Sequence, residues 1–307
     1  MHAVTVIGCV QVDLVLTPVD ALPPAGGSAF VDEMSLRVGG AGANTALALA
    51  EVGVTPRLVG AVGDDHFGRW ILERLASFDL ADDVHVEPGA PTGLTVAAEA
   101  PHRERAFLTY LGVTGTADHA IVPPESLAAE HVLLCDYFCA PPLRGEPTRR
   151  LLADARGHGA RTYFDTAWDP DGFPEPTRKE LYEILPLVDV FLPNEAEACA
   201  LAGVDEVSKA GRALQRRSGG WVVIKLGADG AVAFGPGGGR LACPAPEVEP
   251  ADTTGAGDAF NAGLLAALAS GRDWPDALAA ATGLASSLVA RPSNHRHVNS
   301  VWEGEPS

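Results

Sequence analysis

Short apolar, β-branched runs alternate with helical patterns over most of this 307-residue sequence. Apolar runs at residues 4–8, 57–62, 132–135, 161–164, 188–192, 221–226 and 231–234 predict strands. Between several of them, at residues 149–156, 178–185 and 209–217, apolar positions recur at helical spacing. Strand–helix–strand alternation is typical of a mainly parallel sheet covered by helices. We therefore predict an α/β fold that binds ligands at the carboxyl ends of its strands.

Two stretches without a helical pattern interrupt this alternation. Residues 18–36 contain a proline- and glycine-rich segment, and residues 92–112 hold two extended segments, 94–98 and 106–111, around a polar turn at residues 102–105. The second stretch predicts a hairpin. We expect both stretches to form a small β-element that projects from the main sheet as a lid over an active site. The alternative is a pair of ordinary surface loops.

Composition and charge exclude several classes of partner. A net charge of −18 argues against nucleic acid, which requires clustered lysine and arginine. No apolar run approaches the roughly 18 residues of a membrane span, and the first residues lack the features of a signal peptide, so we expect a cytoplasmic protein. Five scattered cysteines predict no disulfide framework. Since no repeat or long low-complexity tract divides the chain, one domain over residues 1–307 is expected.

Two glycine-rich runs each precede a predicted helix: VGGAGAN at residues 38–44 and DTTGAGD at residues 252–258. Helix N-termini present unpaired amides that suit anions, and glycine lets a ligand approach those amides. The second run therefore predicts a cradle for phosphate oxygens. The alternative is a tight turn in which Asp258 merely caps its helix. Neither run is a P-loop, and the dinucleotide pattern GxGxxG fails because Thr45 and Phe260 occupy its last position.

Taken together and in this order, the two runs resemble the diagnostic motifs of the ribokinase-like (PfkB) carbohydrate kinase family. GDDHFG at residues 63–68, NEAE at residues 194–197 and KLGADG at residues 225–230 are similar to further segments of that family. Asp13, after the first predicted strand, matches an acidic residue that holds substrate hydroxyls. The resemblance spans about residues 4–290. It implies a three-layer α/β/α fold with a mainly parallel central sheet and a small β-sheet lid at residues 14–36 and 92–112.

The resemblance implies an ATP-dependent kinase that transfers the γ-phosphoryl group to a hydroxymethyl group of a small sugar. An alcohol is a poor nucleophile at neutral pH, so a carboxylate within hydrogen-bonding reach helps to remove its proton. Asp258 would be this general base. The backbone amides of Gly255, Ala256 and Gly257 would form the anion hole for the transferred group.

The remaining site residues are also implied by the resemblance. The sugar would contact Asp13, Gly39, Gly40 and Asn44, and ATP would contact Asn194, Lys225, Gly227, Thr254 and Gly257. Glu197 would act on Mg²⁺ through bound water, since magnesium retains its hydration. Three of these residues have ordinary alternatives: a turn former for Asp13, a solvated helix face for Glu197 and a solvent-held strand end for Lys225. Because the lids of many relatives pair, a homodimer is also expected.

The sequence departs from the family pattern in two places that bear on ligands. Ala41 stands where ribokinases commonly carry lysine, and Arg37 is the nearest cation to the first glycine run, so we favour a non-phosphorylated substrate over a sugar phosphate. The run ARPSNHRH at residues 290–297 lacks the glycine expected after its first arginine. In relatives this loop helps to hold a monovalent cation. Asp252 and the Thr254 carbonyl therefore remain candidate ligands for K⁺.

Two other functions remain open at this point. A nucleoside kinase of the same fold would need surfaces for a base, which Phe107, Tyr110, Tyr137 and Phe138 could supply. A non-catalytic sensor of a sugar or nucleotide would be favoured by decay of the base or of the glycine run, and both are intact. The segment at residues 165–170 follows a predicted strand and has no assigned role.

Overall fold

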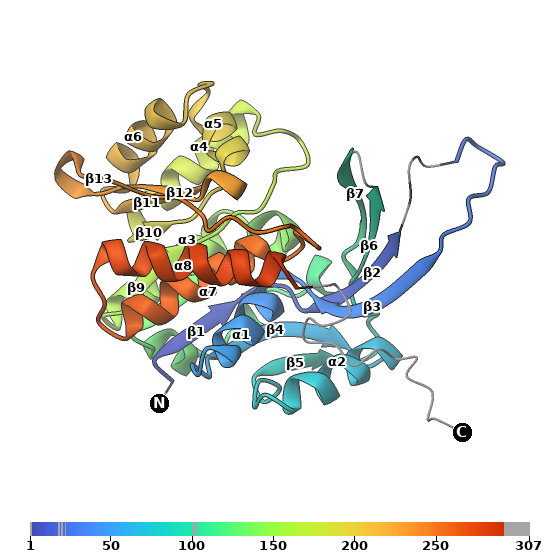
Figure 1. The fold of residues 1–307 in the computed structure, drawn as a ribbon. Helices are drawn as coiled ribbons and strands as arrows, with labels where there is room; N and C mark the ends of the chain where they lie inside the picture. Colours follow the sequence, from blue (N-terminus) through green and yellow to red (C-terminus); the bar gives the residue numbers. More distant parts are fainter. Residues whose placement is uncertain (1, 18, 20, 22, 101–102, 292–307) are drawn as a thin grey trace.

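The computed structural model describes residues 2–17, 19, 21, 23–100 and 103–291 (Figure 1). Its main sheet has nine strands in the order β13-β12-β11-β10-β9-β8-β1-β4-β5. The strands are β1 (Val4–Ile7), β4 (Arg57–Gly63), β5 (Val84–Glu87), β8 (His131–Leu134), β9 (Arg161–Phe164), β10 (Val190–Phe191), β11 (Trp221–Lys225), β12 (Ala231–Phe234) and β13 (Arg240–Cys243). Neighbours from β5 to β11 are parallel, whereas β12 and β13 are antiparallel additions at one edge.

Helices cover both faces of this sheet. One face carries α1 (Ala41–Glu51), α2 (His66–Ala76), α7 (Ala256–Ala269) and α8 (Trp274–Val289); the other carries α3 (Glu146–Gly157), α4 (Glu175–Ile184), α5 (Glu195–Ala202) and α6 (Val207–Ser218). Successive strand residues point to opposite faces, so Leu133 joins the first core and its neighbours Val132 and Leu134 join the second. The result is the predicted three-layer α/β/α arrangement. Among the described residues, no helix is both long and apolar enough to cross a bilayer.

A second sheet of four strands, in the order β3-β2-β6-β7, extends away from the main sheet (Figure 1). It consists of β2 (Gln11–Thr17), β3 (Glu33–Gly39), β6 (Leu94–Ala100) and β7 (Arg103–Tyr110). Strand β2 is antiparallel to β3 and parallel to β6, which sets Asp13 opposite both Arg37 and Thr95. Both stretches without helical pattern thus contribute strands to this small sheet.

Several boundaries differ from those predicted. The predicted turn at residues 102–105 is wrong in part, because β7 begins at Arg103, which pairs with Ala100, and residue 102 lies outside the described residues. Charged residues are common on edge strands such as β7, so their polarity alone did not mark a turn. Asp13 comes after β1, as predicted, but it lies within strand β2 of the small sheet, so the turn-former alternative is wrong. Strands β5 and β13 and helices α2 and α8 were not predicted.

Candidate active site

Asp258 lies in the first turn of α7, beside the N-terminus of α1. Gly255 is the N-cap of α7 and adopts the left-handed backbone conformation (φ 73°) that suits glycine. Asp258 therefore does not cap its own helix, and that alternative is wrong. Instead, its Oδ2 accepts a hydrogen bond of 2.9 Å from Asn44 Nδ2. The two helices that follow the glycine-rich runs thus meet through these two side chains.

The surroundings of Asp258 tune its acidity. Desolvation raises its pKa to about 6, and the nearby negative charge of Asp165 adds to the rise. The hydrogen bond from Asn44 and the charge of Lys225 act in the opposite direction, because both stabilise the carboxylate. The carboxylate is therefore ionised at neutral pH but remains basic enough to accept a proton.

Asp13, which belongs to strand β2 of the small sheet, lies close enough to Asp258 for the two carboxylates to interact. Burial raises its pKa to about 6; a hydrogen bond from Gln11 opposes the rise, and the charge of Asp258 adds to it. Its carboxylate lies against Gly39, where any Cβ would collide with it. The structure thus brings together Asp13, Gly39 and Asn44, three of the predicted sugar contacts, at one end of the main sheet.

Asp136 is an acid of this region that the sequence reasoning missed. It follows β8 in the left-handed conformation (φ 60°), and its Oδ2 accepts hydrogen bonds from the amides of Cys9 (3.0 Å) and Gly42 (3.2 Å). Burial and then the charge of Asp258 raise its pKa to about 7. Its position directly after a parallel strand was the available signal, since such positions gather at the ligand-binding edge of the sheet.

Lys225 ends β11 and is held by Asp165, which follows β9. Its Nζ lies 2.6 Å from Asp165 Oδ2, and Asn261 of α7 donates a second hydrogen bond of 2.6 Å to the same oxygen. Burial alone would lower the pKa of Lys225, but the carboxylates of Asp165 and Glu197 outweigh it, so the pKa is raised. A lysine held only by solvent is therefore the wrong interpretation. The lysine also gives the segment after β9 a structural role.

Glu197 and Asn194 form a capping box at the start of α5. The Asn194 backbone amide and its Nδ2 each donate to the Glu197 carboxylate at 2.8 Å, and Asn194 Oδ1 accepts from the Glu197 amide at 2.8 Å. Glu197 is 4% exposed, so the solvated-face alternative is wrong. Burial, followed by the charge of Asp165, raises its pKa to about 7. A parallel bridge between Asn194 and Lys225 brings this cap beside the lysine.

This region carries surplus negative charge that suits a hydrated cation. Two largely buried carboxylates, Asp165 and Glu197, face the single ammonium group of Lys225. Among the described residues, however, no group of three or more acidic, histidine or cysteine side chains could hold a metal alone. The residues therefore fit a magnesium ion that keeps waters and ligand oxygens, and they do not fit a cage made entirely of protein ligands.

Residues 252–258, here termed the anion loop, separate two hollows. A large cavity of about 610 Å³ is lined on the loop side by Thr253, Ala256 and Gly257. Its other walls come from Lys225, Gly227, Ala228 and Gly230, from residues 245–248 and 250, and from Phe260, Thr282, Ala285, Ser286 and Val289. The last four lie on α8, which the sequence reasoning did not identify. Their recurrence at helical spacing was the only signal.

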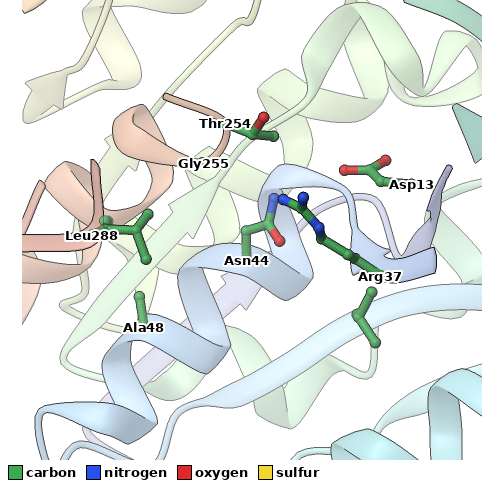
Figure 2. Close-up of a pocket in the computed structure, with 9 residues that line it drawn as sticks. Asp13, Arg37, Asn44, Ala48, Thr254, Gly255 and Leu288 are labelled. Carbon is green, nitrogen blue, oxygen red and sulfur yellow. The ribbon is translucent and has the colours of Figure 1, made fainter. Parts of the chain in front are cut away.

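On the other side of the anion loop is a small pocket of about 40 Å³, lined by Asp13, Arg37, Asn44, Thr254, Gly255 and apolar neighbours (Figure 2). Because Gly255 is the N-cap of α7, the amides that follow it are those that a helix leaves unpaired. That of Ala256 makes a long bond of 3.3 Å to the Thr253 carbonyl. No described side chain caps this helix end.

Asp252 faces a cation, but that cation is a side chain. Arg37 Nη1 lies 2.7 Å from Asp252 Oδ2, with side-chain exposures of 8% and 0%, and Asp252 Oδ1 accepts from the Thr254 amide at 2.8 Å. Residues 292–297 of the expected cation loop lie outside the described residues. The described residues do not fit K⁺ at Oδ2 of Asp252, since a guanidinium already occupies that oxygen. Nor is Arg37 a free counter-charge for a sugar phosphate.

The aromatic residues considered for a nucleoside base do not gather at one pocket. Tyr137 and Phe138 are buried in the core beneath α3 and α4, and the Tyr137 hydroxyl donates to Glu180 at 2.7 Å. Phe107 and Tyr110 lie exposed on β7 of the small sheet. This arrangement removes the sequence feature that favoured a nucleoside acceptor.

The model of the pfkB family of carbohydrate kinases matches residues 1–297. The chain belongs to this family. Its members are phosphotransferases with an alcohol group as acceptor. Among its relatives, the ribokinase of Bacillus subtilis is 31% identical over 296 residues, covering 94% of this chain and 93% of that protein. The 2-dehydro-3-deoxygluconokinase of Thermoproteus tenax is 29% identical over 286 residues, with coverages of 90% and 86%.

Solved structures confirm the ribokinase-like fold of this pfkB family member. The adenosine kinase of Sinorhizobium meliloti superposes with a TM-score of 0.82 at 24% identity and covers 94% of each chain. An Escherichia coli protein solved in complex with ATP and Mg²⁺ has a TM-score of 0.81 at 22% identity, covering 95% of this chain and 94% of its own. At these identities the likeness concerns the fold alone.

Proposed function

We propose that this chain is an ATP-dependent sugar kinase that phosphorylates a hydroxymethyl group of a small, non-phosphorylated sugar. The observation that supports it most is the placement of the anion loop that carries Asp258. Thr254 and Gly255 of this loop line the small pocket, whereas Thr253, Ala256 and Gly257 line the large cavity. A phosphoryl donor on one side and an alcohol on the other would then meet at the start of α7. In-line transfer requires this kind of opposed arrangement.

ATP would occupy the large cavity. Its volume of about 610 Å³ and mainly apolar lining suit a nucleotide base and ribose, since ligand pockets commonly measure about 300–1,000 Å³. Gly227 on one wall and Gly257 on the loop would lie along the nucleotide, while Lys225 would meet its phosphates. Asn194, which is bridged to Lys225, would complete this side, whereas Thr254 lines the small pocket across the anion loop. The E. coli neighbour solved with ATP and Mg²⁺ supports a nucleotide and a magnesium ion here.

Glu197 would hold hydrated Mg²⁺ near the phosphates, with Asp165 contributing charge. When bound, the ion supplies positive charge that offsets the charge of the phosphate oxygens. Lys225 remains paired with Asp165 at 2.6 Å and so is held in one orientation toward the loop. The capping box keeps the Glu197 carboxylate beside it.

The sugar would bind above the small pocket, with its hydroxyls on Asp13, Asn44 and the backbone at Gly39 and Gly40. Carboxylate oxygens accept hydroxyl protons, and an amide side chain can both donate and accept. Asp258 would take the proton of the reacting hydroxyl, and its pKa of about 6 keeps it ionised at neutral pH. The amides of Gly255, Ala256 and Gly257 would stabilise the transferring group.

The small sheet would act as the lid of one kinase domain over residues 1–307, with segments 14–36 and 92–112 covering the sugar. Excluding water would prevent it from competing as the phosphoryl acceptor. This sheet region exposes large apolar side chains, namely Phe30, Met34, Phe107, Leu108 and Tyr110. Exposed apolar patches commonly mark interfaces, so we propose that two copies pair through this surface as a homodimer.

ADP release with Mg-ATP over a panel of pentoses, hexoses, sugar acids, sugar phosphates and nucleosides tests this function. We expect acceptor-dependent turnover that is highest for a non-phosphorylated sugar, measured against an assay without acceptor. Faster turnover of a nucleoside or a sugar phosphate would contradict the substrate assignment. No turnover on any acceptor, with intact ATP binding, would favour a non-catalytic sensor.

A further inference from the structure

The ion pair between Arg37 and Asp252 joins the small sheet to the anion loop. Arg37 belongs to β3, and Asp252 precedes the N-cap of α7 by three residues; they are 215 positions apart in the chain. The pair is almost completely buried, with side-chain exposures of 8% and 0%. Because this buried ion pair joins two segments that are distant in the sequence, it fixes the position of the loop relative to the small sheet.

Each residue of the ion pair also makes contacts within its own segment, Arg37 within the small sheet and Asp252 within the anion loop. Arg37 Nε donates to Ser35 Oγ at 3.2 Å, and its backbone is paired across the sheet with Asp13. Asp252 Oδ1 accepts a hydrogen bond of 2.8 Å from the Thr254 amide, and Thr254 directly precedes Gly255, the N-cap of α7. The same carboxylate therefore organises the loop backbone with one oxygen and receives the guanidinium with the other.

The chemistry of the pair favours a permanent internal cation. An ionised carboxylate buried without a counter-ion is strongly destabilised, so Asp252 needs a positive charge beside it. The guanidinium stays charged at every accessible pH and is more weakly hydrated than an ammonium group, which suits a buried position. With Arg37 Nη1 at 2.7 Å, the position beside Oδ2 is already filled.

We propose that Arg37 is a positioning residue that supplies, from the small sheet, the fixed charge that holds the anion loop in its phosphate-binding shape. No monovalent cation is then required at Asp252. The loop is ordered only when β3 is in place, so the sheet that carries Asp13 also governs the amides of the anion loop. The catalytic part of this inference rests on the proposed function; the cation part does not.

The test compares wild type, Arg37→Ala and Arg37→Gln in buffers whose only monovalent cation is either tetramethylammonium or K⁺, with added guanidinium as a third condition. We expect kcat of the wild type to change less than about twofold between conditions. Arg37→Ala should lose at least about tenfold in kcat in tetramethylammonium, within the range of losses seen for displaced catalytic geometry. K⁺ or guanidinium should recover part of this loss, and KM for the sugar should change less than kcat.

A second readout does not depend on turnover. The thermal midpoint of Arg37→Ala without ATP should rise with K⁺ or guanidinium concentration, whereas that of the wild type should not. Arg57→Ala is the matched control. It removes a different ion pair, in which Arg57 Nε lies 3.1 Å from Asp83 Oδ2, and its thermal midpoint should show no such response. Should Arg37→Ala not fold, Arg37→Gln keeps most of the side chain without the charge.

Three results would overturn the inference. They are a wild-type rate that depends several-fold on K⁺, unchanged kcat in both Arg37 variants, and a loss that no small cation reverses in kcat or midpoint. The last would assign Arg37 to packing alone. If the wild type turns over no acceptor, the midpoint comparison still decides the cation part, which separates its failure from that of the proposed function.

Discussion

Helices α1 and α7 both follow glycine-rich runs, yet their N-termini are built for different purposes. At α1, a Cβ added to Gly42 would lie 2.6 Å from the carbonyl carbon of Gly8, and the Gly42 amide already donates to Asp136. At α7, a Cβ added to Gly257 would approach nothing closer than Lys225 Nζ, at 3.6 Å. One helix start is thus packed against protein and paired with a protein carboxylate; the other faces the large cavity.

The difference teaches that glycine serves two needs here. At α1 it lets two backbone segments approach closely, and Asp136 takes the place that an anionic ligand could occupy at a helix N-terminus. At α7 it leaves amides accessible, with no described side chain at the cap. The two runs are similar in sequence, but the start of α7 is the one whose residues line the large cavity, and it is also where the sequence predicted the phosphate cradle.

Among variants that compare the two helix starts, the largest effects should come from adding one methyl group at each. Gly257→Ala should fold with unchanged or slightly higher stability, because alanine is favoured over glycine in a helix by up to about 1 kcal/mol. Its kcat should fall at least about tenfold, since the methyl group would intrude where the transferring phosphoryl group meets the loop amides.

Gly42→Ala is the matched variant and should show the opposite pattern. Overpacking against the Gly8 backbone should cost about 1–3 kcal/mol of unfolding free energy. Urea unfolding and ADP release on both variants measure the contrast. If the two variants lose similar amounts of unfolding free energy and have similar kcat values, the proposed difference between the helix starts is wrong.

Replacement of Asp136 should change stability at α1 in a pH-dependent way. Its pKa is raised to about 7 by burial, so its folding contribution is greatest at low pH and is lost as pH rises through 7. Asp136→Asn removes this loss while its Oδ1 can still accept the amides of Cys9 and Gly42. The variant should match the wild type at pH 4 and below, where the unfolded carboxyl is protonated, and exceed it by about 1–3 kcal/mol at pH 8. A variant that is less stable at pH 8 in urea unfolding would contradict this view.

The hydrogen bond that joins the two helices should produce the smallest effect. Asn44 lowers the pKa of Asp258 by donating to its carboxylate, so Asn44→Ala should move the acid limb of kcat/KM to higher pH, by about one unit. Activity requires the ionised base and therefore falls below this limb. Values of kcat/KM measured between pH 5 and 8 on both proteins test the shift. An acid limb at the same pH in both would show that Asn44 does not lower the pKa of Asp258.

Much of the fold could be predicted because apolar periodicity reports burial directly. The strands that hold the site, such as β1, β8 and β9, are short β-branched or apolar runs, and their helices repeat at 3.6 residues. Strand β13 and helix α8 were missed for a physical reason. Strand β13 has only four residues at the sheet edge, too few to show a clear alternation of apolar and polar positions. Helix α8 is rich in alanine and serine, so its buried and exposed faces differ little in hydrophobicity.

Site residues were predicted where a motif keeps them close in sequence, and missed where the partner is distant. Asp258 lies within the second glycine run and Glu197 within the segment NEAE, so the resemblance to the family implied a role for each, and both roles remain predictions. Arg37 could be identified as a cation but not as the partner of Asp252, because their contact depends on how the small sheet meets α7. Asp136 and Asp165 likewise depend on parallel strands ending at the same edge.

The central claim, that Asp258 is the base at the helix start that faces the ligand, is tested most directly by Asp258→Asn. One sample of this variant should be assayed for ATP binding by calorimetry and for kcat by ADP release on the best acceptor. We predict an ATP dissociation constant within a few-fold of wild type. We also predict a fall in kcat of at least about 10²-fold, the lower end of a general base's contribution. An unchanged kcat with intact binding would remove Asp258 from its assigned role.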